Sequence, residues 1–320
     1  MKPQKVYKMV HTLGKTYGPK ERFYHFFYGY LLPSIDQMTK IATEEPSCHF
    51  LMESCGPLMD EKAREIIPLS NLSWEIIEDQ QSFQLNSATV VEVKRWDVLL
   101  REMQFFQGYG FFLGILKKIN LATKSFFVDS DEHRYKERYQ LLRQKKSLLR
   151  SLKSTRNIIL SWIDRGVNMK HLDIYDNKFL LLKRSPPPES YQQDGGWSVR
   201  KYGSSRRGLM GLENAAKLMN DNGIPCAIFE AGAFSLPEQI AVFHACRGVI
   251  GIYGAEFANL IWMKPKRQAI VVNPREASSP SIVLAPELDI FYKEIPLPPE
   301  SYPELTGKLL ESVIEIITRK

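Results

Sequence analysis

The stretch from Ser235 to Pro274 constrains the fold more strongly than any other part of this chain. Its apolar residues predict a helix, a short buried strand over residues 248–253, a tight turn at Gly254-Ala255, a second helix and a second strand. Parallel sheets bind anions where a strand ends and a helix begins, because free helix N–H groups and the helix dipole attract negative charge there. The turn at Gly254 is therefore a candidate phosphate site, although every strand–glycine–helix unit has this shape.

The same alternation of strands and helices continues through the rest of the chain, which favours an α/β fold with largely parallel sheets. An aromatic-rich helix is expected to be interrupted at Pro33, and the chain after Pro274 is expected to be loop-like because it contains many prolines. Strands are predicted at residues 5–10, 48–54, 73–78, 88–93, 178–183 and 224–230, and helices at residues 21–42, 59–67, 96–116, 131–164, 208–222 and 305–317.

A chain of 320 residues is long enough for two domains. We expect two Rossmann-like α/β domains that face a cleft, an amino-terminal one over residues 1–165 and a carboxy-terminal one over residues 166–300. A basic helix near residues 131–164 connects them. The last segment, residues 301–320, is expected to be a terminal helix that could pack back on the amino-terminal domain.

The composition is that of a globular protein, with 44% hydrophobic and 25% charged residues. The start of the chain contains no apolar block of the signal-peptide type, and no run of about 18 uncharged apolar residues occurs, so we expect no membrane span and at most peripheral membrane contact. The histidines show no metal-ligand spacing with cysteines or acids. The four cysteines lack the C-x-x-C spacing and suit a reduced, cytoplasmic protein. The oligomeric state is left open.

The net charge of +7 is concentrated in one segment. Between Arg134 and Arg156, nine Lys and Arg residues stand against one acid, Glu137. Two interpretations stay open. In the first, an apolar stripe packs this helix on a domain and water solvates its basic faces. In the second, the helix contacts an anionic partner such as nucleic acid, membrane lipid or an acidic glycan. Nucleic acid is not the partner that we expect.

Arginines flank the candidate phosphate site in the predicted topology. Arg184 follows a predicted strand, and Arg206 and Arg207 precede a predicted helix. In a parallel sheet these positions and the Gly254 turn could come to the same edge. Guanidinium groups pair bidentately with phosphate oxygens, so the set predicts a diphosphate clamp, although each arginine by itself is usually a surface residue.

A long motif follows these arginines and resembles glycosyltransferase family 61. The family's aromatic–histidine helix start is also similar to Phe23–Phe27 followed by Leu31-Leu32-Pro33. The resemblance spans roughly residues 20–275 and is strongest over residues 224–274. The motif reads S-x-x-E-Q-I-x-x-F-x-A-x-x-x-V-I-G-x-x-G-A-x-x-x-N, carried by Ser235, Glu238, Gln239, Ile240, Phe243, Ala245, Val249, Ile250, Gly251, Gly254, Ala255 and Asn259.

The resemblance implies a GT-B-like fold and inverting transfer of a hexosyl or pentosyl group from a nucleotide sugar, commonly UDP-linked, to a glycan or polysaccharide. It places the nucleotide in the carboxy-terminal domain and the acceptor against the amino-terminal one. It implies no metal and no other cofactor, because arginines and helix-end donors stabilise the leaving diphosphate. The triplet Asp129-Ser130-Asp131 could instead suggest a metal-dependent transferase, or could cap the basic helix.

An inverting transfer needs a general base that deprotonates the acceptor hydroxyl. The first choice is His25, which matches the family's amino-terminal pattern, and the second is Glu53 at a predicted strand end. Asp36 and Asp194 are further candidates. The alternative for His25 is a packed histidine within an aromatic cluster.

The remaining candidates surround the nucleotide. Glu230 ends a strand and could meet the ribose or the base edge, and Asn259 could reach a phosphate or tie down the turn. Tyr253-Gly254-Ala255-Glu256 stands where the family usually has H-G-A-G, so Tyr253 would replace a hydrogen-bond donor to phosphate. Glu256 could point away, bind ribose hydroxyls or mark a changed donor. A non-catalytic relative that binds a nucleotide sugar or glycan is therefore the alternative function.

Overall fold

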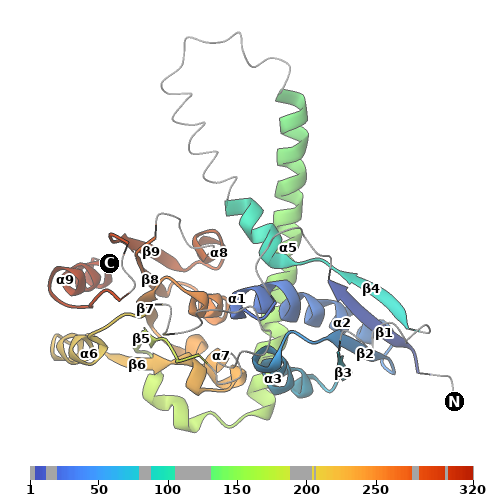
Figure 1. The fold of residues 1–320 in the computed structure, drawn as a ribbon, viewed down its shortest axis with the longest axis horizontal. Coiled ribbons are helices and arrows are strands. Elements are labelled where there is room, and N and C mark those ends of the chain that lie inside the picture. The colour runs from blue at the N-terminus through green and yellow to red at the C-terminus, as the bar shows by residue number, and fades with distance from the viewer. Residues whose placement is uncertain are drawn as a thin grey trace.

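The computed structural model describes residues 4–11, 20–78, 88–104, 131–187, 204, 207–275, 281–299 and 302–319, and for residues 131–143 the backbone alone. It contains two parallel sheets, one in each half of the chain, with helices between them (Figure 1). The expectation of a mixed α/β fold with parallel sheets is confirmed.

The first sheet has the order β3-β2-β1-β4, and each neighbouring pair is parallel. The chain builds β1, β2 and β3 in one direction and then returns to the other side of β1 for β4. The carboxyl ends of β1 and β4 therefore form a topological switch point, which we call the amino-terminal switch point. Its strands are β1 (Val6–His11), β2 (His49–Glu53), β3 (Ser73–Ile77) and β4 (Thr89–Val93).

The second sheet has the order β6-β5-β7-β8-β9 and is also parallel throughout. The chain runs from β5 to β6 and then crosses to the other side of β5 for β7, so the carboxyl ends of β5 and β7 form the carboxy-terminal switch point. The central strands β7 and β8 are buried throughout, as is usual where helices cover both faces. The strands are β5 (Phe179–Lys183), β6 (Cys226–Glu230), β7 (Gly248–Ile252), β8 (Gln268–Asn273) and β9 (Phe291–Pro296).

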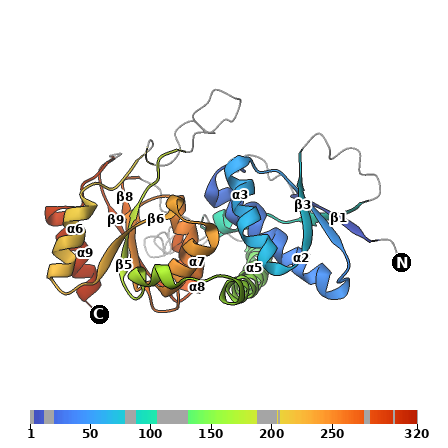
Figure 2. The same ribbon diagram turned by 90° about the horizontal axis from the view of Figure 1, so that it is seen from below.

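Helices fill the space between the sheets and cover the outer face of the second sheet (Figure 2). Residues 96–104 are also helical. The helices of the first half are α1 (Phe23–Phe26), the π-helical turn η1 (Phe27–Leu31), α2 (Leu32–Glu44), α3 (Pro57–Ile66), η2 (Ile67–Ser70) and α5 (Asp131–Gly166). Those of the second half are η4 (Lys170–Tyr175), α6 (Leu212–Asp221), η7 (Ala231–Ala233), α7 (Leu236–Ala245), η8 (Ala255–Trp262), α8 (Ser281–Glu287) and α9 (Gly307–Thr318).

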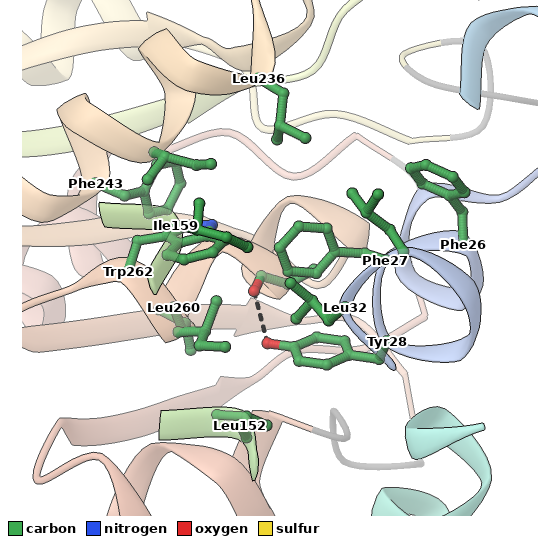
Figure 3. Packing of buried hydrophobic residues seen from close by; sticks show 14 of the residues in the cluster. Phe26, Phe27, Tyr28, Leu32, Leu152, Ile159, Leu236, Phe243, Leu260 and Trp262 are labelled. Carbon is green, nitrogen blue, oxygen red and sulfur yellow. Dashed lines mark hydrogen bonds between the residues drawn. The ribbon is translucent and has the colours of Figure 1, made fainter. Parts of the chain in front are cut away.

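One hydrophobic core joins the two sheets. The rings of Phe27 and Trp262 meet edge to face, with centroids 5.7 Å apart. The Tyr28 hydroxyl donates a hydrogen bond of 2.7 Å to the carbonyl of Ala258 (Figure 3). Leu152 and Ile159 of α5 pack into the same cluster, so the apolar stripe on the basic helix faces the core. Each half of the chain thus contributes side chains that the other half buries.

The helix at residues 21–42 is not interrupted at Pro33, in contrast to the sequence-based expectation. It continues from α1 through η1 into α2. The backbone N–H of Leu32 bonds to the carbonyl of Phe27, five residues back, which is the π-helical pattern. This wider turn directly precedes Pro33, which lies in the first turn of α2, where its missing N–H costs little.

The carboxy-terminal region differs from the sequence-based expectation in two respects. The segment after Pro274 contains α8 and β9 as well as loops; β9 is an edge strand with a partly exposed, alternating pattern. The terminal helix α9 does not pack on the amino-terminal half. Its apolar face, including Leu310 and Val313, packs with α6 in a second cluster on the outer face of the second sheet (Figure 2).

The four cysteines are free and buried. Within the part of the chain that the structure describes, no helix is long and apolar enough to cross a membrane.

Candidate functional site

An ion pair lies at the carboxy-terminal switch point. Arg184 directly follows β5, and Glu256 lies in the first turn of η8 after β7. The Nε of Arg184 donates a hydrogen bond of 2.8 Å to Oε1 of Glu256. Only 8% of the Arg184 side chain and 18% of the Glu256 side chain are exposed. The predicted phosphate edge therefore holds an internal carboxylate against its buried arginine.

Gly254 leaves room for this pair to pack on the turn. A Cβ at this position would lie 2.3 Å from Oε2 of Glu256 and 3.3 Å from the guanidinium carbon of Arg184. The backbone of Gly254 is extended, so the constraint is the close approach of these side chains and not a left-handed conformation. Ala255 follows as the first residue of η8.

Several buried polar atoms around this turn are not satisfied by the described residues. Nη1 of Arg184, Oγ of Ser185 and Oε2 of Glu256 have no hydrogen-bond partner there. Ser185 comes close to η7, because a Cβ on Gly232 would lie 2.3 Å from its Oγ. Buried polar groups are usually paired, and such a group of exceptions is typical of a ligand site.

Tyr253 lies beneath two arginines at the same edge. The guanidinium carbons of Arg207 and Arg275 each lie 5.1 Å from the centre of the Tyr253 ring. Cation–π attraction at this distance holds the positive groups over the ring. Sequence reasoning missed Arg275, although it follows the strand β8 just as Arg184 follows β5. Arg206 lies outside the described residues.

A second polar group lies beside the amino-terminal switch point. Arg95 and Asp97 follow β4, and the Nδ1 of His25 lies 2.8 Å from Oδ2 of Asp97. Arg95 donates to both carboxylate oxygens of Asp97, from Nε at 3.0 Å and from Nη2 at 2.6 Å. Burial alone would raise the pKa of Asp97, but the hydrogen bonds from His25 and Arg95 outweigh it and hold the pKa below its usual value. Asp97 is therefore a buried carboxylate that orients His25.

The π-helical turn makes room for this group. A Cβ on Gly29 would lie 2.9 Å from Oδ1 of Asp97 and 3.1 Å from Nε of Arg95. The local sequence thus combines a helix that carries His25 with a glycine that lets the Arg95–Asp97 pair approach the helix backbone. Sequence reasoning identified His25 but missed both of its partners.

Helix α1 connects the two polar groups. It packs against η8. The Tyr24 ring meets the His25 ring edge to face at 5.5 Å. Burial raises the pKa of Tyr24, and the charge of Asp97 and the Tyr253 hydroxyl raise it further. The Tyr24 hydroxyl is buried and has no hydrogen-bond partner among the described residues. Helix α1 therefore lies beside both the His25–Asp97 pair and η8, which follows Tyr253.

The other predicted nucleotide residues have partners within the protein. Glu230, at the end of β6, lies 3.1 Å from the Nζ of Lys183, its neighbour at the end of β5. Asn259 is buried, and its Nδ2 donates to Oε1 of Gln239 at 3.3 Å, which ties η8 to α7. The Oδ1 of Asn259 is buried and has no hydrogen-bond partner among the described residues.

The alternative bases have other neighbours or lie outside the described residues. Glu53 ends β2, beside Ile77 of β3. Asp36 lies between α2 and α5, where its Oδ2 accepts a hydrogen bond of 2.6 Å from Lys40. Asp194 and the Asp129-Ser130 part of the D-x-D triplet lie outside the described residues. Where the structure describes the chain, no three His, Cys, Asp or Glu residues are grouped in a way that could hold a metal ion.

The basic helix α5 uses some of its charges for packing. Lys145 pairs with Glu287 of α8, and Arg156 donates to the carbonyls of Trp262 and Met263. Lys146, Arg150 and Lys153 remain exposed on one side of the helix. The solvated-helix interpretation accounts for this arrangement, and binding to an anionic partner stays a hypothesis.

The family described as Glycosyltransferase 61 matches residues 23–271. Among solved structures, a chain described as "the glycosyl transferase family 9 from Veillonella parvula DSM 2008" is similar at 9% sequence identity with a TM-score of 0.34, over 99% of this chain and 92% of that chain. No curated protein matches this sequence.

Proposed function

This chain belongs to the glycosyltransferase 61 family, and we propose that it is an inverting glycosyltransferase with a nucleotide sugar, in the first place a UDP-sugar, as its donor. The transferred group is a hexosyl or pentosyl residue, and the acceptor is a glycan or polysaccharide. We propose that the cytoplasm is where it acts, in polysaccharide biosynthesis, with residues 166–300 on the donor side of a cleft and residues 1–165 on the acceptor side.

The observation that carries the proposal is that one helix, α1, holds His25 and packs against η8, which begins just after Tyr253. His25 and Tyr253 each belong to one of the polar groups that lie at or beside the switch points, where open α/β sheets bind ligands. One group holds an oriented histidine, and the other holds arginines and unsatisfied polar atoms. A transferase needs a base and a leaving-group site close to each other, and this arrangement supplies candidates for both.

The donor phosphates are proposed to bind at the carboxy-terminal switch point. Arg207 and Arg275 lie over Tyr253, and Arg184, at the adjacent Gly254 turn, has an unsatisfied Nη1. Guanidinium groups donate charge-assisted hydrogen bonds to phosphate oxygens, and they stabilise the charge that develops on the leaving diphosphate. We propose that these arginines make the reaction independent of a metal.

The acceptor is proposed to be activated by His25. The carboxylate of Asp97 accepts a hydrogen bond from Nδ1, which leaves the lone pair of Nε2 available as a base. Nε2 then removes the proton of the acceptor hydroxyl while the hydroxyl oxygen attacks the anomeric carbon. The bond from that carbon to the diphosphate breaks on the opposite face, so the configuration inverts. The His25 side chain is 23% exposed, which leaves it reachable from solvent.

A donor panel tests the proposal. The purified chain is screened by thermal shift against UDP, GDP, CMP and their sugars, and then assayed for hydrolysis and transfer with each donor that binds. Stabilisation by one nucleotide class together with turnover of its sugar is the expected result. Absence of both binding and turnover for every donor would overturn it.

The Arg184–Glu256 pair favours a second candidate, a non-catalytic relative that binds a nucleotide sugar or glycan. The carboxylate of Glu256 occupies part of the place at which the leaving diphosphate must be stabilised. Binding of a donor with no hydrolysis and no transfer to any acceptor glycan would favour this second function.

A further inference from the structure

Glu256 lies at the carboxy-terminal switch point, where open α/β sheets usually bind their ligands. In the second sheet the switch point lies between β5 and β7. Arg184 directly follows β5, and the Gly254 turn follows β7. The Glu256 carboxylate lies between them, hydrogen-bonded to Arg184 and folded back over Gly254. An anion from the protein itself therefore already lies at the anion site of the sheet.

The pair is only half satisfied. Arg184 uses Nε for Glu256, whereas its Nη1 is buried without a partner among the described residues. Oε2 of Glu256 is also buried without a hydrogen-bond partner among the described residues. Nη1 needs an acceptor, and a phosphate oxygen is a suitable one. Any phosphate that reaches Nη1 also comes close to the negative charge of Glu256.

The two forms of a nucleotide that meet this site differ in charge. A sugar-linked nucleoside diphosphate carries about two negative charges, one on each doubly esterified phosphate. The free nucleoside diphosphate carries about three at neutral pH, because its terminal phosphate loses a second proton near pH 6. A fixed carboxylate repels the free nucleotide more strongly than the sugar-linked one, and low exposure strengthens that repulsion.

We propose that Glu256 is a specificity-determining residue that favours the intact, sugar-linked donor over the free nucleoside diphosphate. Its carboxylate pairs with Arg184 in the way that one phosphate oxygen would. It therefore repels each additional negative charge on a bound nucleotide. The inference rests on the proposed donor site. Its consequence for the reaction is weak retention of the nucleoside diphosphate that transfer releases.

The test compares UDP and UDP-glucose as probes on the full chain, with dissociation constants from calorimetry at pH 7.5. In Glu256→Gln, which keeps an acceptor for Arg184, UDP should gain at least fivefold in affinity relative to UDP-glucose. Glu256→Asp keeps the charge and should show the preference of the unchanged chain. Glu287→Gln removes a carboxylate that pairs with Lys145 elsewhere, and it controls for net charge.

Each outcome decides the proposal. Two results for Glu256→Gln would overturn the role of Glu256 and leave the donor site intact. One is an unchanged ratio of the two affinities, and the other is a fall in the affinity for UDP relative to that for UDP-glucose. If neither the unchanged chain nor Glu256→Gln binds any nucleotide of the donor panel, the proposed function fails and the inference fails with it. The unchanged chain gives a check that needs no variant: UDP binding more than tenfold tighter than UDP-glucose also overturns the proposal.

Discussion

His25 and Asp97 are 72 positions apart in the chain, yet the Nδ1 of one lies 2.8 Å from Oδ2 of the other. Arg95 holds the Asp97 carboxylate from its other side with two hydrogen bonds. This order, a buried cation, a buried anion and a partly exposed imidazole, fixes which nitrogen of His25 is free for chemistry.

Replacement of His25 by alanine should depress transfer and leave donor binding intact, because the donor site is built from other residues. Loss of a general base costs on the order of 10²–10⁴-fold in turnover. Steady-state kinetics and calorimetry with the same donor measure the two effects separately. His49→Ala, at the opposite end of the first sheet, is the matched control. Turnover equal to that of the unchanged chain would rule out His25 as the base.

Asp97→Asn should act on turnover through the histidine. An asparagine amide can donate to Nδ1, which would place the proton of His25 on Nε2 and remove its lone pair. We expect a fall in kcat on the order of 10³-fold with a small change in KM. Steady-state kinetics measures kcat and KM separately. Asp60→Asn, another buried and hydrogen-bonded aspartate, should leave kcat unchanged. A change in KM as large as the fall in kcat would contradict a role for Asp97 in positioning the base.

Arg207→Ala should weaken the binding of a nucleoside diphosphate. The change removes a charge-assisted hydrogen bond, which is worth roughly 1.5–3 kcal/mol, or about 10–150-fold in the dissociation constant. Calorimetry with UDP measures it. Arg165→Ala, an exposed arginine in the last turn of α5, is the control for charge. Unchanged affinity in the Arg207 variant would remove this residue from the phosphate site.

The carboxy-terminal switch point could be predicted from local sequence signals. The apolar run at residues 248–253 predicted β7 almost to the residue, because a strand that is buried on both faces has few polar side chains. The glycine after it marked the turn, and Arg184 does lie beside that turn. Each of these signals belongs to a short segment, so tertiary structure was not needed to recognise them.

The amino-terminal group could not be predicted in the same way. Nothing in the sequence around Asp97 distinguishes it from an ordinary solvated acid; only the tertiary fold, which brings α1 to the segment after β4, places His25 beside it. The π-helical turn was not predicted, because Pro33 directly after it usually signals that a helix is interrupted. The strand β9 was missed because it is partly exposed and ends in Pro296, so its pairing with β8 outweighs weak local preference.

Tyr28→Phe should lower the stability of the whole fold. The hydroxyl of Tyr28 donates to the carbonyl of Ala258 inside the core that joins the two halves. Its removal leaves a buried acceptor unpaired, at a cost of about 1–3 kcal/mol. Urea unfolding at pH 7 measures the free energy of unfolding. Tyr24→Phe is the control, because its buried hydroxyl has no partner among the described residues, so its loss should cost little. Equal costs for the two variants would contradict the role of the Tyr28 bond.

Stability should fall as the pH falls from about 6.5 to about 4, and His11 should be one cause. Burial is the main reason why the pKa of His11 is lowered to about 4. The hydrogen bond with the Tyr30 carbonyl raises this pKa, whereas the charges of Arg95 and Lys20 lower it further. Between these pH values the unfolded chain binds a proton at His11 that the folded chain does not bind. The stability from the neutral histidine is therefore complete above pH 6.5 and is lost as the pH falls toward 4, by about 3 kcal/mol in all.

His11→Gln separates this residue from the carboxylates, which titrate mainly below pH 5. Glutamine does not ionise in this range, and its amide can bond to Ser34, which lies 2.9 Å from Nε2 of His11. Urea unfolding at pH 5.5, 6.0, 6.5 and 7.0 should show a slope of stability with pH in the unchanged chain that is clearly smaller in the variant. If the slopes of the unchanged chain and of His11→Gln agree, His11 is protonated equally in the folded and unfolded states. The prediction that His11 is buried in its neutral form at the end of β1 would then be wrong.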